Sequence, residues 1–369
     1  MIIGIDTRFW NQTGVGRYLK NLCKNLHEID NKNGYILFIQ SEDREDIEKI
    51  ITNKNWKIVI VDIPWHTLAE QIQFPKVLDS YSCDVVHFPY FSVPVRYKGK
   101  FIVTIHDLII HHFSTGKAST LPYPAYFLKR QAYKYIIQKA AEKADRIIAV
   151  SNATKNEIID KLHIDHTKIS VSYEGVDPAL AVGKSKASPE KFLLYVGNMY
   201  PHKNIDRLID AIARLNLKGT DLKLYCVGKS DFFQKRYKDL VLQKKLQNTI
   251  IFLENIDDKN LADLYTNAVA TIMPSLMEGF GLPLLEAMSA ECITIASDIP
   301  SLKEVCLDIP IYVDPYSSES IAEGIEKALL LDSDEKKNLQ KKGRARSELF
   351  SWRKMAEETL SVYENSYSL

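Results

Sequence analysis

Short apolar runs alternate with amphipathic stretches along the whole chain, and the runs fall into two successive series. The first series lies at residues 2–5, 35–39, 56–61, 85–88, 101–105 and 146–150, and the second at residues 192–196, 222–227, 249–253, 269–273, 292–296 and 311–313. Continuous apolar runs of this kind are typical of parallel strands that are buried on both faces of a sheet. The stretches between them predict helices, because their apolar residues recur on one helical face, as Val15, Leu19, Leu22 and Leu26 do. This alternation predicts an α/β fold.

A small, polar stretch at residues 181–190 separates the two series and is the best linker candidate in the chain. A length of 369 residues also favours two domains over one. We therefore predict an N-terminal domain at residues 1–182, a C-terminal domain at residues 190–350 and a final helix at residues 351–369. Ligands of open α/β sheets bind beyond the carboxyl ends of the strands, so the loops after the predicted strands are the candidate sites.

Composition and charge narrow the classes of function. Hydrophobic residues make up 46% of the chain and charged residues 26%, as in soluble globular proteins. A net charge of +1 produces no strong field, so we expect no nucleic-acid partner. The five cysteines are scattered without the spacing of a zinc site, and we expect no metal. No apolar run is long enough to cross a bilayer and no leader precedes the first strand, which predicts a cytoplasmic protein.

One loop of the second half combines glycines, a proline and two acids. It follows the predicted strand at 269–273 and runs from Glu278 to Glu286, with Gly281 and Pro283 between them. Pro283 suits the first turn of a helix, which would place Glu286 in that turn and aim the N–H groups of residues 280–282 at an anion. Two carboxylates repel an anion unless they accept hydrogen bonds from hydroxyls, and a sugar nucleotide offers both a diphosphate and hydroxyls. The alternatives are that Glu286 only offsets the helix dipole and that Glu278 is a solvent-exposed acid in a loop.

A second loop carries a lysine in an unusual place. Lys203 follows the strand at 192–196 and the turn at Gly197 and Asn198, and it stands where a helix begins. The helix dipole disfavours a cation there, which suggests a role in neutralising a diphosphate leaving group rather than a plain surface position.

The first half contributes two weaker candidates. Gly14 and Gly16 open a helix after the first strand, but the third glycine of a dinucleotide-binding loop would fall on Leu19, which argues against a nicotinamide enzyme. A simple strand-to-helix turn remains the alternative. His106 and Asp107 end the strand at 101–105; the histidine is either structural or a ligand-binding group, and the aspartate orients it or caps the next helix.

The spacing of Glu278 and Glu286 around Gly-Phe-Gly-Leu-Pro resembles the motif of the retaining glycosyltransferases of glycosyltransferase family four, also called glycosyltransferase group one. The segment 171–177 resembles a stretch that ends the first domain in that family and that marks the fold rather than the chemistry. The resemblance implies the GT-B fold, in which two Rossmann-like domains face each other across a cleft and the C-terminal helix packs back on the first domain. It further implies that the domain at residues 1–182 binds the acceptor and that the domain at residues 190–350 binds the nucleotide-sugar donor. It also implies a set of site residues. The catalytic ones are His106, Lys203 and Glu278, and the donor-binding ones are Gly14, Gly16, Gly197, Asn198, Lys203, Ser275, Phe280, Gly281, Leu282 and Glu286.

The same resemblance implies transfer of a hexose from a nucleotide diphosphate sugar to an acceptor hydroxyl, with retention and without a metal or other cofactor. Mannose from GDP-mannose is the first expectation and a UDP-sugar the next. The acceptor is expected to be a carbohydrate or lipid-linked chain in the assembly of a surface polysaccharide, lipopolysaccharide or glycolipid. A GT-B sugar-nucleotide epimerase and a non-catalytic sugar-nucleotide-binding protein are the alternatives.

Two further stretches bear on partners. The triplet Asp332-Ser-Asp334 has the form of a metal-binding motif, but it lies in a polar stretch between helices and not after a strand, so we assign it no metal. Residues 117–143 combine basic and aromatic side chains, which makes this stretch a candidate for peripheral contact with the inner face of a membrane. An ordinary helix with its tyrosines turned inward is the alternative.

Overall fold

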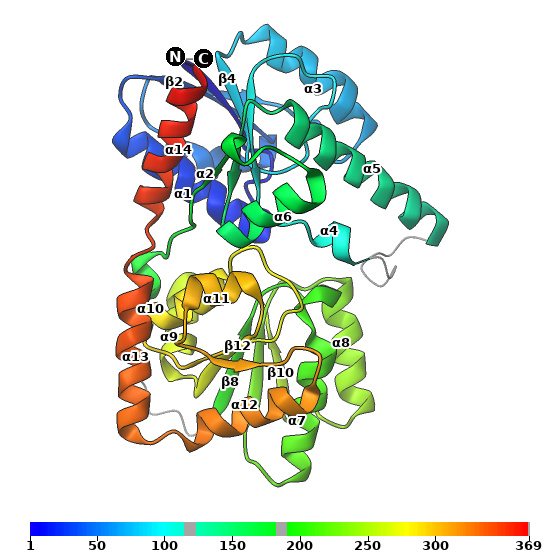
Figure 1. Ribbon diagram of the computed structural model, residues 1–369, viewed down its shortest axis with the longest axis vertical. Coiled ribbons are helices and arrows are strands. Elements are labelled where there is room, and N and C mark those ends of the chain that lie inside the picture. Colours follow the sequence, from blue (N-terminus) through cyan, green and yellow to red (C-terminus); the bar gives the residue numbers. More distant parts are fainter. Residues whose placement is uncertain (114–122, 182–189, 368–369) are drawn as a thin grey trace. The chain divides into compact units, whose positions relative to one another are not determined.

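The computed structural model describes residues 1–113, 123–181 and 190–367, so most of the predicted linker at 181–190 lies outside the described residues. The described chain falls into two compact units. Unit 1 holds residues 1–113, 123–175 and 352–367, and unit 2 holds residues 176–351 apart from the gap (Figure 1). The boundary between the units on the first pass of the chain is at residues 175 and 176, a few residues before the predicted end of the first domain at 182.

Unit 1 is built on a seven-stranded parallel sheet in the order β3-β2-β1-β4-β5-β6-β7. Its strands are β1 (Ile2–Asp6), β2 (Gly34–Ile39), β3 (Trp56–Ile60), β4 (Val85–Phe88), β5 (Phe101–Ile105), β6 (Arg146–Ala149) and β7 (Ile169–Val171). The six strands predicted from the first apolar series are confirmed. The short β7 was not predicted, because three residues carry too little pattern to stand out.

Helices cover this sheet and supply its core. They are α1 (Thr13–Ile29), α2 (Arg44–Ile50), α3 (Leu68–Ser80), α4 (Ile109–His112), α5 (Tyr123–Lys143), α6 (Asn152–Leu162) and α14 (Trp352–Tyr367), with short 3-10 turns at Ser41–Asp43 and His166–Lys168. The predicted apolar face of α1 is buried at Leu19, Leu22 and Leu26. The C-terminal helix α14 packs against α1 within unit 1, as expected for the fold, and its Tyr363 is fully buried (Figure 1).

Unit 2 repeats the design with a six-stranded parallel sheet in the order β10-β9-β8-β11-β12-β13. Its strands are β8 (Phe192–Val196), β9 (Lys223–Val227), β10 (Ile250–Leu253), β11 (Ala270–Met273), β12 (Thr294–Ser297) and β13 (Ile311–Val313). Its helices are α7 (Ile205–Leu217), α8 (Phe232–Gln243), α9 (Asp258–Asn267), α10 (Leu282–Ser289), α11 (Pro300–Cys306), α12 (Ser318–Leu330) and α13 (Ser333–Ser347), with 3-10 turns η3 (Pro178–Leu180) and η4 (Pro201–Lys203). All six predicted strands of the second series are present, with ends shifted by at most two residues.

The strand order reverses once in each sheet, and this reversal determines where ligands can bind. In unit 1 the chain passes from β1 outward to β2 and β3 and then returns to β4 on the other side of β1. In unit 2 it passes from β8 to β9 and β10 and returns to β11 beside β8. The crevice between diverging connections at such a point is the usual ligand site of doubly wound sheets. The candidate ligand-binding loops are therefore those after β1 and β4 in unit 1 and those after β8 and β11 in unit 2.

In the described parts of the chain, no helix is both long and apolar enough to span a membrane.

Candidate active site

The two loops at the reversal point of unit 2 carry the predicted Lys203 and Glu278, and the structure brings these side chains together. Lys203 ends the turn η4 after β8, and Glu278 lies in the loop between β11 and α10. The Lys203 ammonium donates to both carboxylate oxygens of Glu278, at 2.7 Å to Oε1 and 2.8 Å to Oε2. The side chains are 16% and 9% exposed, so this is a largely buried ion pair. From the sequence, Lys203 was expected to meet the diphosphate of a donor and Glu278 its hydroxyls. In this structure each is the counter-ion of the other.

Asn204 links the loop after β8 to the loop after β11 through hydrogen bonds of its side chain. Its backbone is left-handed, with φ of 63°, a conformation that asparagine tolerates better than most residues. Its side-chain amide donates to the carbonyl oxygens of Pro274 at 2.8 Å and Pro315 at 2.7 Å. The N–H of Leu276 donates to the carbonyl of His202 at 2.8 Å, which ties the β11 loop to η4 a second time. Hydrogen bonds to the backbone thus fix the loops that carry the ion pair, and this positioning role of Asn204 was not predicted from the sequence.

The electrostatics of these loops keep the ion pair charged. Burial alone would raise the pKa of Glu278, but the Lys203 ammonium and its hydrogen bonds outweigh burial and leave that pKa below its ordinary value. Burial and the neighbouring Lys203 lower the pKa of His202 to about 4, so this ring is neutral at physiological pH. Ser275, another predicted donor-binding residue, is fully buried in the same loop. Near neutral pH the group therefore contains one cation and one anion and no further charge from the histidine.

The start of α10 has the backbone geometry that the glycine and proline predicted. Gly281 precedes the helix with φ of 104°, and a Cβ there would lie 2.5 Å from Leu302 Cδ2, so only glycine fits. Leu282 and Pro283 open the helix. Phe280 is buried, 4% exposed, and its ring packs edge-on against Phe350 with the centroids 5.8 Å apart.

Glu286 lies in the second turn of α10 and not in the first, so the prediction of its place in the helix was wrong. The helix begins at Leu282, and its first turn contains no acid. The Glu286 carboxylate is 3% exposed and accepts a hydrogen bond of 2.8 Å from the hydroxyl of Tyr265 on α9. A carboxylate that only offset the helix dipole would lie in the first turn and near solvent, so the buried position of Glu286 in the second turn argues against that role.

Gly197 and Asn198 turn the chain between β8 and η4. Gly197 has φ of 147°, and the Tyr195 hydroxyl donates to the Asn198 carbonyl at 2.5 Å, which pins the turn to the end of β8. A Cβ on Gly228, just after β9, would lie 2.5 Å from the Gly197 carbonyl oxygen. The two turns therefore pass each other at a distance that requires glycine, and Gly228 is a second position that the sequence analysis missed.

In unit 1, His106 is fixed on both sides of its ring. Its Nδ1 lies 3.1 Å from a carboxylate oxygen of Glu174 and its Nε2 lies 3.0 Å from the carbonyl oxygen of Pro89. Burial would lower the pKa of His106, but Glu174 reverses the effect and leaves that pKa above its ordinary value. Tyr18 contacts the imidazole edge-on, with ring centroids 5.0 Å apart. The segment 171–177 was predicted to be a marker of the fold, and its Glu174 also raises the pKa of His106, the predicted catalytic histidine.

The remaining predicted residues of unit 1 lie in the first turn of α1. A Cβ on Gly16 would approach the Trp10 carbonyl oxygen to 2.4 Å, so packing within the unit requires this glycine. A Cβ on Gly14 would meet nothing within 4 Å, so packing does not explain that residue. Asp107, after β5, accepts the N–H of Ile109, the first residue of α4, at 2.9 Å, although the N-cap position of that helix is Leu108.

Two family models match consecutive parts of the chain. The one described as Glycosyltransferase Family 4 matches residues 12–180, and the one described as Glycosyl transferases group 1 matches residues 180–346. The chain belongs to the group 1 glycosyltransferases of family 4.

Individual relatives agree with this assignment. The glycosyltransferase is 26% identical to O-antigen chain mannosyltransferase B of Escherichia coli over 379 residues, which cover 95% of this chain and 96% of that protein. It is 28% identical to O-antigen chain mannosyltransferase RfbU of Salmonella typhimurium over 218 residues, which cover 59% of this chain and only 58% of that relative. Its fold is similar to that of HepE from Anabaena in complex with UDP-glucose, with a TM-score of 0.79 at 16% identity and coverage of 99% and 100% of the two chains.

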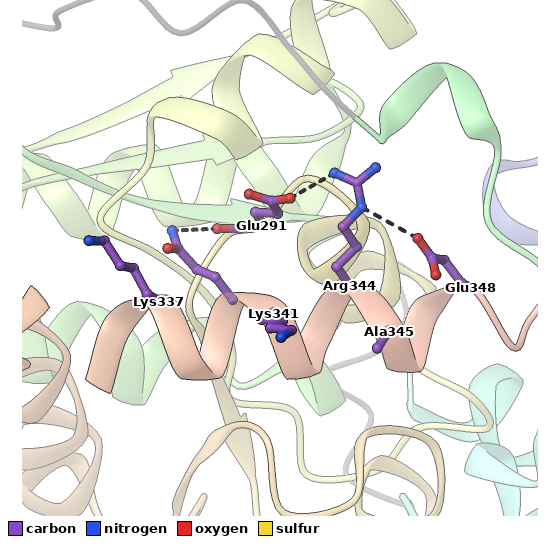
Figure 2. A pocket seen from close by; sticks show the side chains of 7 residues that line it. Glu291, Lys337, Lys341, Arg344, Ala345 and Glu348 are labelled. Atoms are coloured by element: carbon purple, nitrogen blue, oxygen red, sulfur yellow. Dashed lines mark hydrogen bonds and ion pairs between the residues drawn. The ribbon is translucent and has the colours of Figure 1, made fainter. Parts of the chain in front are cut away.

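Two other features of this glycosyltransferase lie away from the predicted residues. Asp332 caps α13 through the N–H groups of residues 334 and 335, which accounts for the Asp332-Ser-Asp334 triplet; this stretch opens a helix and is not a linker between helices. A shallow hollow along α13 is lined mostly by charged side chains, which include an ion-paired arginine (Figure 2). There Arg344 donates to Glu291 at 2.7 Å and to Glu348 at 3.4 Å. Within the described residues, no cluster of three or more histidine, cysteine or acidic side chains could hold a metal ion.

Proposed function

We propose that this glycosyltransferase moves a hexose, with mannose first in order of expectation, from a nucleotide diphosphate sugar to a hydroxyl of a growing surface glycan. The observation that carries the proposal is the buried Lys203–Glu278 pair at the reversal point of the unit 2 sheet. A diphosphate brings negative charge to Lys203, and sugar hydroxyls can donate to Glu278. The names of the two O-antigen mannosyltransferases support the sugar and the kind of acceptor, while the UDP-glucose complex of HepE keeps a UDP-sugar as the second choice.

The proposed mechanism retains the anomeric configuration and uses no metal. The Lys203 ammonium and the N–H groups at the start of α10 supply positive charge to the leaving diphosphate, a form of electrostatic catalysis that fixed donors perform well in a site without water. Glu278 accepts hydrogen bonds from hydroxyls of the transferred sugar, and Glu286 accepts them from the ribose. His106 lies in unit 1 and is proposed to position the sugar.

A donor panel tests the proposal. The purified chain is incubated with GDP-mannose, UDP-glucose and related donors, with and without oligomannose acceptors, and nucleoside diphosphate release and the anomeric configuration of the product are measured. Acceptor-dependent release with retention is expected. Release of an isomerised sugar without acceptor would indicate an epimerase, and donor binding without turnover would indicate a binding protein.

Two variants connect the site to the activity. Lys203→Ala and Glu278→Ala should each lower kcat/KM by about 100-fold or more, because each removes an interaction that strengthens in the transition state. Lys218→Ala is the matched control, since Lys218 is 61% exposed and pairs with Glu326 on the surface of the same unit. Near-normal turnover in both site variants would refute the assignment of the site.

We also propose peripheral contact with the inner face of a membrane through residues 117–143, of which 117–122 lie outside the described residues. On α5 the side chains of Phe127, Leu128 and Tyr135 are 46%, 69% and 56% exposed, among several lysines. Exposed apolar and basic groups on one helix are suited to acidic lipid. Flotation with vesicles containing phosphatidylglycerol should carry the protein upward at low salt, and the double variant Phe127→Ser, Leu128→Ser should remain at the bottom. Equal flotation with purely zwitterionic vesicles would contradict the proposal.

A further inference from the structure

The two nitrogens of the His106 ring both face atoms that accept hydrogen bonds. Nδ1 lies 3.1 Å from a carboxylate oxygen of Glu174, and Nε2 lies 3.0 Å from the carbonyl oxygen of Pro89. A neutral imidazole has one N–H and can donate to only one of these oxygens, whereas an imidazolium donates to both. The side chains of His106 and Glu174 are 12% and 7% exposed, so an unprotonated nitrogen against an oxygen would be costly here. The contacts therefore fit a doubly protonated ring.

The alternative arrangement is a protonated Glu174 carboxyl that donates to a neutral ring. Imidazole, with an ordinary pKa of about 6.5, is a stronger base than a glutamate carboxylate, with an ordinary pKa of about 4.3, so the shared proton favours the ring. The surroundings act in the same direction. Burial lowers the pKa of His106, but Glu174 and, less strongly, Asp107 reverse that effect and raise it.

A second buried histidine shows that burial alone gives the opposite result. His87 lies on β4, which pairs with β5, and it is fully buried. Its Nδ1 lies 2.6 Å from the Tyr363 hydroxyl and its Nε2 lies 2.8 Å from the Thr104 hydroxyl. Hydroxyls can both donate and accept, so a neutral ring satisfies both contacts, and burial lowers the pKa of His87 to about 3. The two histidines therefore differ in charge because their hydrogen-bond partners differ.

Other titratable side chains surround the His106 ring on neighbouring elements. Tyr18 of α1 lies perpendicular to it, with ring centroids 5.0 Å apart, and burial raises the pKa of that hydroxyl. Tyr18 and His87 therefore stay neutral near pH 7, and Glu174 and Asp107 carry the negative charge around the ring. Glu174 is the one of these two acids that contacts the ring directly, so it is the residue whose removal should change the charge of His106.

We propose that Glu174 is a positioning residue that keeps His106 doubly protonated, so that His106 serves the transfer as a fixed cation and not as the base that takes the proton of the acceptor hydroxyl. A general base needs an unprotonated atom within reach of the proton that it abstracts. In this arrangement both ring nitrogens carry protons and donate to the protein. A fixed positive charge instead stabilises negative charge that develops in the transition state. The inference rests on the proposed transfer for the use of this charge, whereas the protonation state of the ring is measurable without substrate.

Nitrogen NMR of the full chain labelled with 15N-histidine tests the protonation state directly. At pH 7 both ring nitrogens of His106 should be protonated, and His106→Gln, which removes these signals, assigns them among the nine histidines. In Glu174→Gln the ring should be neutral at the same pH, because burial remains without the carboxylate that offsets it, and Glu174→Asp should restore part of the protonation. Glu157→Gln is the matched control, since Glu157 lies 3.1 Å from His112 Nε2 at a more exposed position, and it should leave the His106 signals unchanged. A neutral His106 ring in the wild type at pH 7, or an imidazolium that persists in Glu174→Gln, would overturn the proposal; the wild-type measurement needs no variant beyond the assignment.

The pH dependence of transfer distinguishes a fixed cation from a base. Wild-type kcat/KM should fall as pH rises through the pKa of His106 measured by NMR, because the cation is lost. In Glu174→Gln this fall should move to lower pH and kcat/KM at pH 7 should drop about tenfold or more, with recovery in Glu174→Asp and no change in Glu157→Gln. A kcat/KM that rises with pH through the titration of His106 would identify a base, and an equal loss at every pH would indicate a structural role for Glu174; either result contradicts the proposal. If the wild type turns over no donor, the proposed transfer fails, and the NMR result still decides the charge of His106.

Discussion

Removal of Lys203 should destabilise unit 2 by an amount that depends on pH. The substitution Lys203→Met leaves Glu278 buried without its counter-ion, a change that costs about 3–5 kcal/mol in comparable buried pairs. For a domain of this size, such a loss lowers Tm by roughly 6–20 °C. Glu278→Gln leaves a lysine that is 16% exposed and can turn toward water, so its cost should be smaller, about 1–2 kcal/mol.

The pH dependence follows from the direction of the pKa shift. In the wild type the pKa of Glu278 is lowered, so its contribution to stability is present above its ordinary pKa of 4.5 and is lost only as pH falls through the lower folded value. Between about pH 5 and pH 8 the wild-type contribution is therefore constant. In Lys203→Met, burial raises the pKa of the carboxyl, which can then take up a proton at the lower pH. The cost of the substitution should be about 1–3 kcal/mol smaller at pH 5 than at pH 8.

Scanning calorimetry of the full chain at the two pH values measures these differences. Calorimetry is needed because all four tryptophans lie in unit 1 and do not report on unit 2. The double variant Lys203→Met, Glu278→Gln should lose far less than the sum of the single variants, with a coupling of about 2–3 kcal/mol. Lys218→Met, which breaks an exposed pair of 2.6 Å in the same unit, should change stability by less than about 0.5 kcal/mol. Equal costs of Lys203→Met at both pH values, or additive single variants, would refute the reasoning.

Three other substitutions test the packing of the candidate site. Glu174→Gln should lower the pKa of His106. A histidine whose pKa is raised in the folded state stabilises the fold below about pH 6.5, and this contribution disappears as pH rises. Urea titrations followed by tryptophan fluorescence should therefore show a larger loss of stability in this variant at about pH 6 than at pH 9. Gly281→Ala should lower the free energy of unfolding by about 1–3 kcal/mol, since the φ of Gly281 is 104° and an added Cβ would meet Leu302. Gly14→Ala is the control and should leave Tm unchanged, because an added Cβ there meets nothing within 4 Å. A large loss of Tm in Gly14→Ala would contradict this reasoning. Tyr363→Phe removes a buried hydrogen bond of 2.6 Å to His87 and should cost about 1–2 kcal/mol in urea, whereas Tyr367→Phe, on the exposed end of α14, should have no effect.

The sequence predicted the strands well because their pattern is local. Most of the apolar runs are buried on both faces of a parallel sheet, with β3 and β10 at the sheet edges partly exposed, so composition distinguishes the runs from their neighbours. The backbone at Gly281 and Pro283 was also predictable, since the conformations that these residues favour do not depend on distant parts of the chain. The helix α10 begins at Leu282, one residue too early for Glu286 to lie in its first turn, because helix ends depend on capping and packing as much as on composition.

The partners of the site residues were not predictable, because they come from distant parts of the chain. Glu174 is 68 residues from His106, and the two meet because β6 pairs with β5 on one side and β7 on the other. The sequence of β7 is only three residues long and gave no sign of this pairing. Asn204 was adjacent to a predicted residue, and an asparagine just before a helix is a recognised signal of left-handed backbone. Its contacts to Pro274 and Pro315, however, depend on the arrangement of the whole sheet edge.

The pairing of Lys203 with Glu278 resolves a conflict that the sequence alone left open. Two carboxylates near the start of α10 would repel a diphosphate if both presented free charge. In the structure Glu278 is neutralised by Lys203, and Glu286 is buried with the Tyr265 hydroxyl as a donor. In the proposed reaction, a diphosphate that binds the Lys203 ammonium shares the charge that now neutralises Glu278, so the Glu278 carboxylate gains from further donors at the same buried position. Sugar hydroxyls are such donors, whereas inorganic diphosphate or a nucleoside diphosphate alone provides none for that carboxylate. If the proposed function holds, the ion pair should favour a complete sugar nucleotide over its parts, because the sugar supplies hydrogen bonds to Glu278 when Lys203 turns toward the diphosphate.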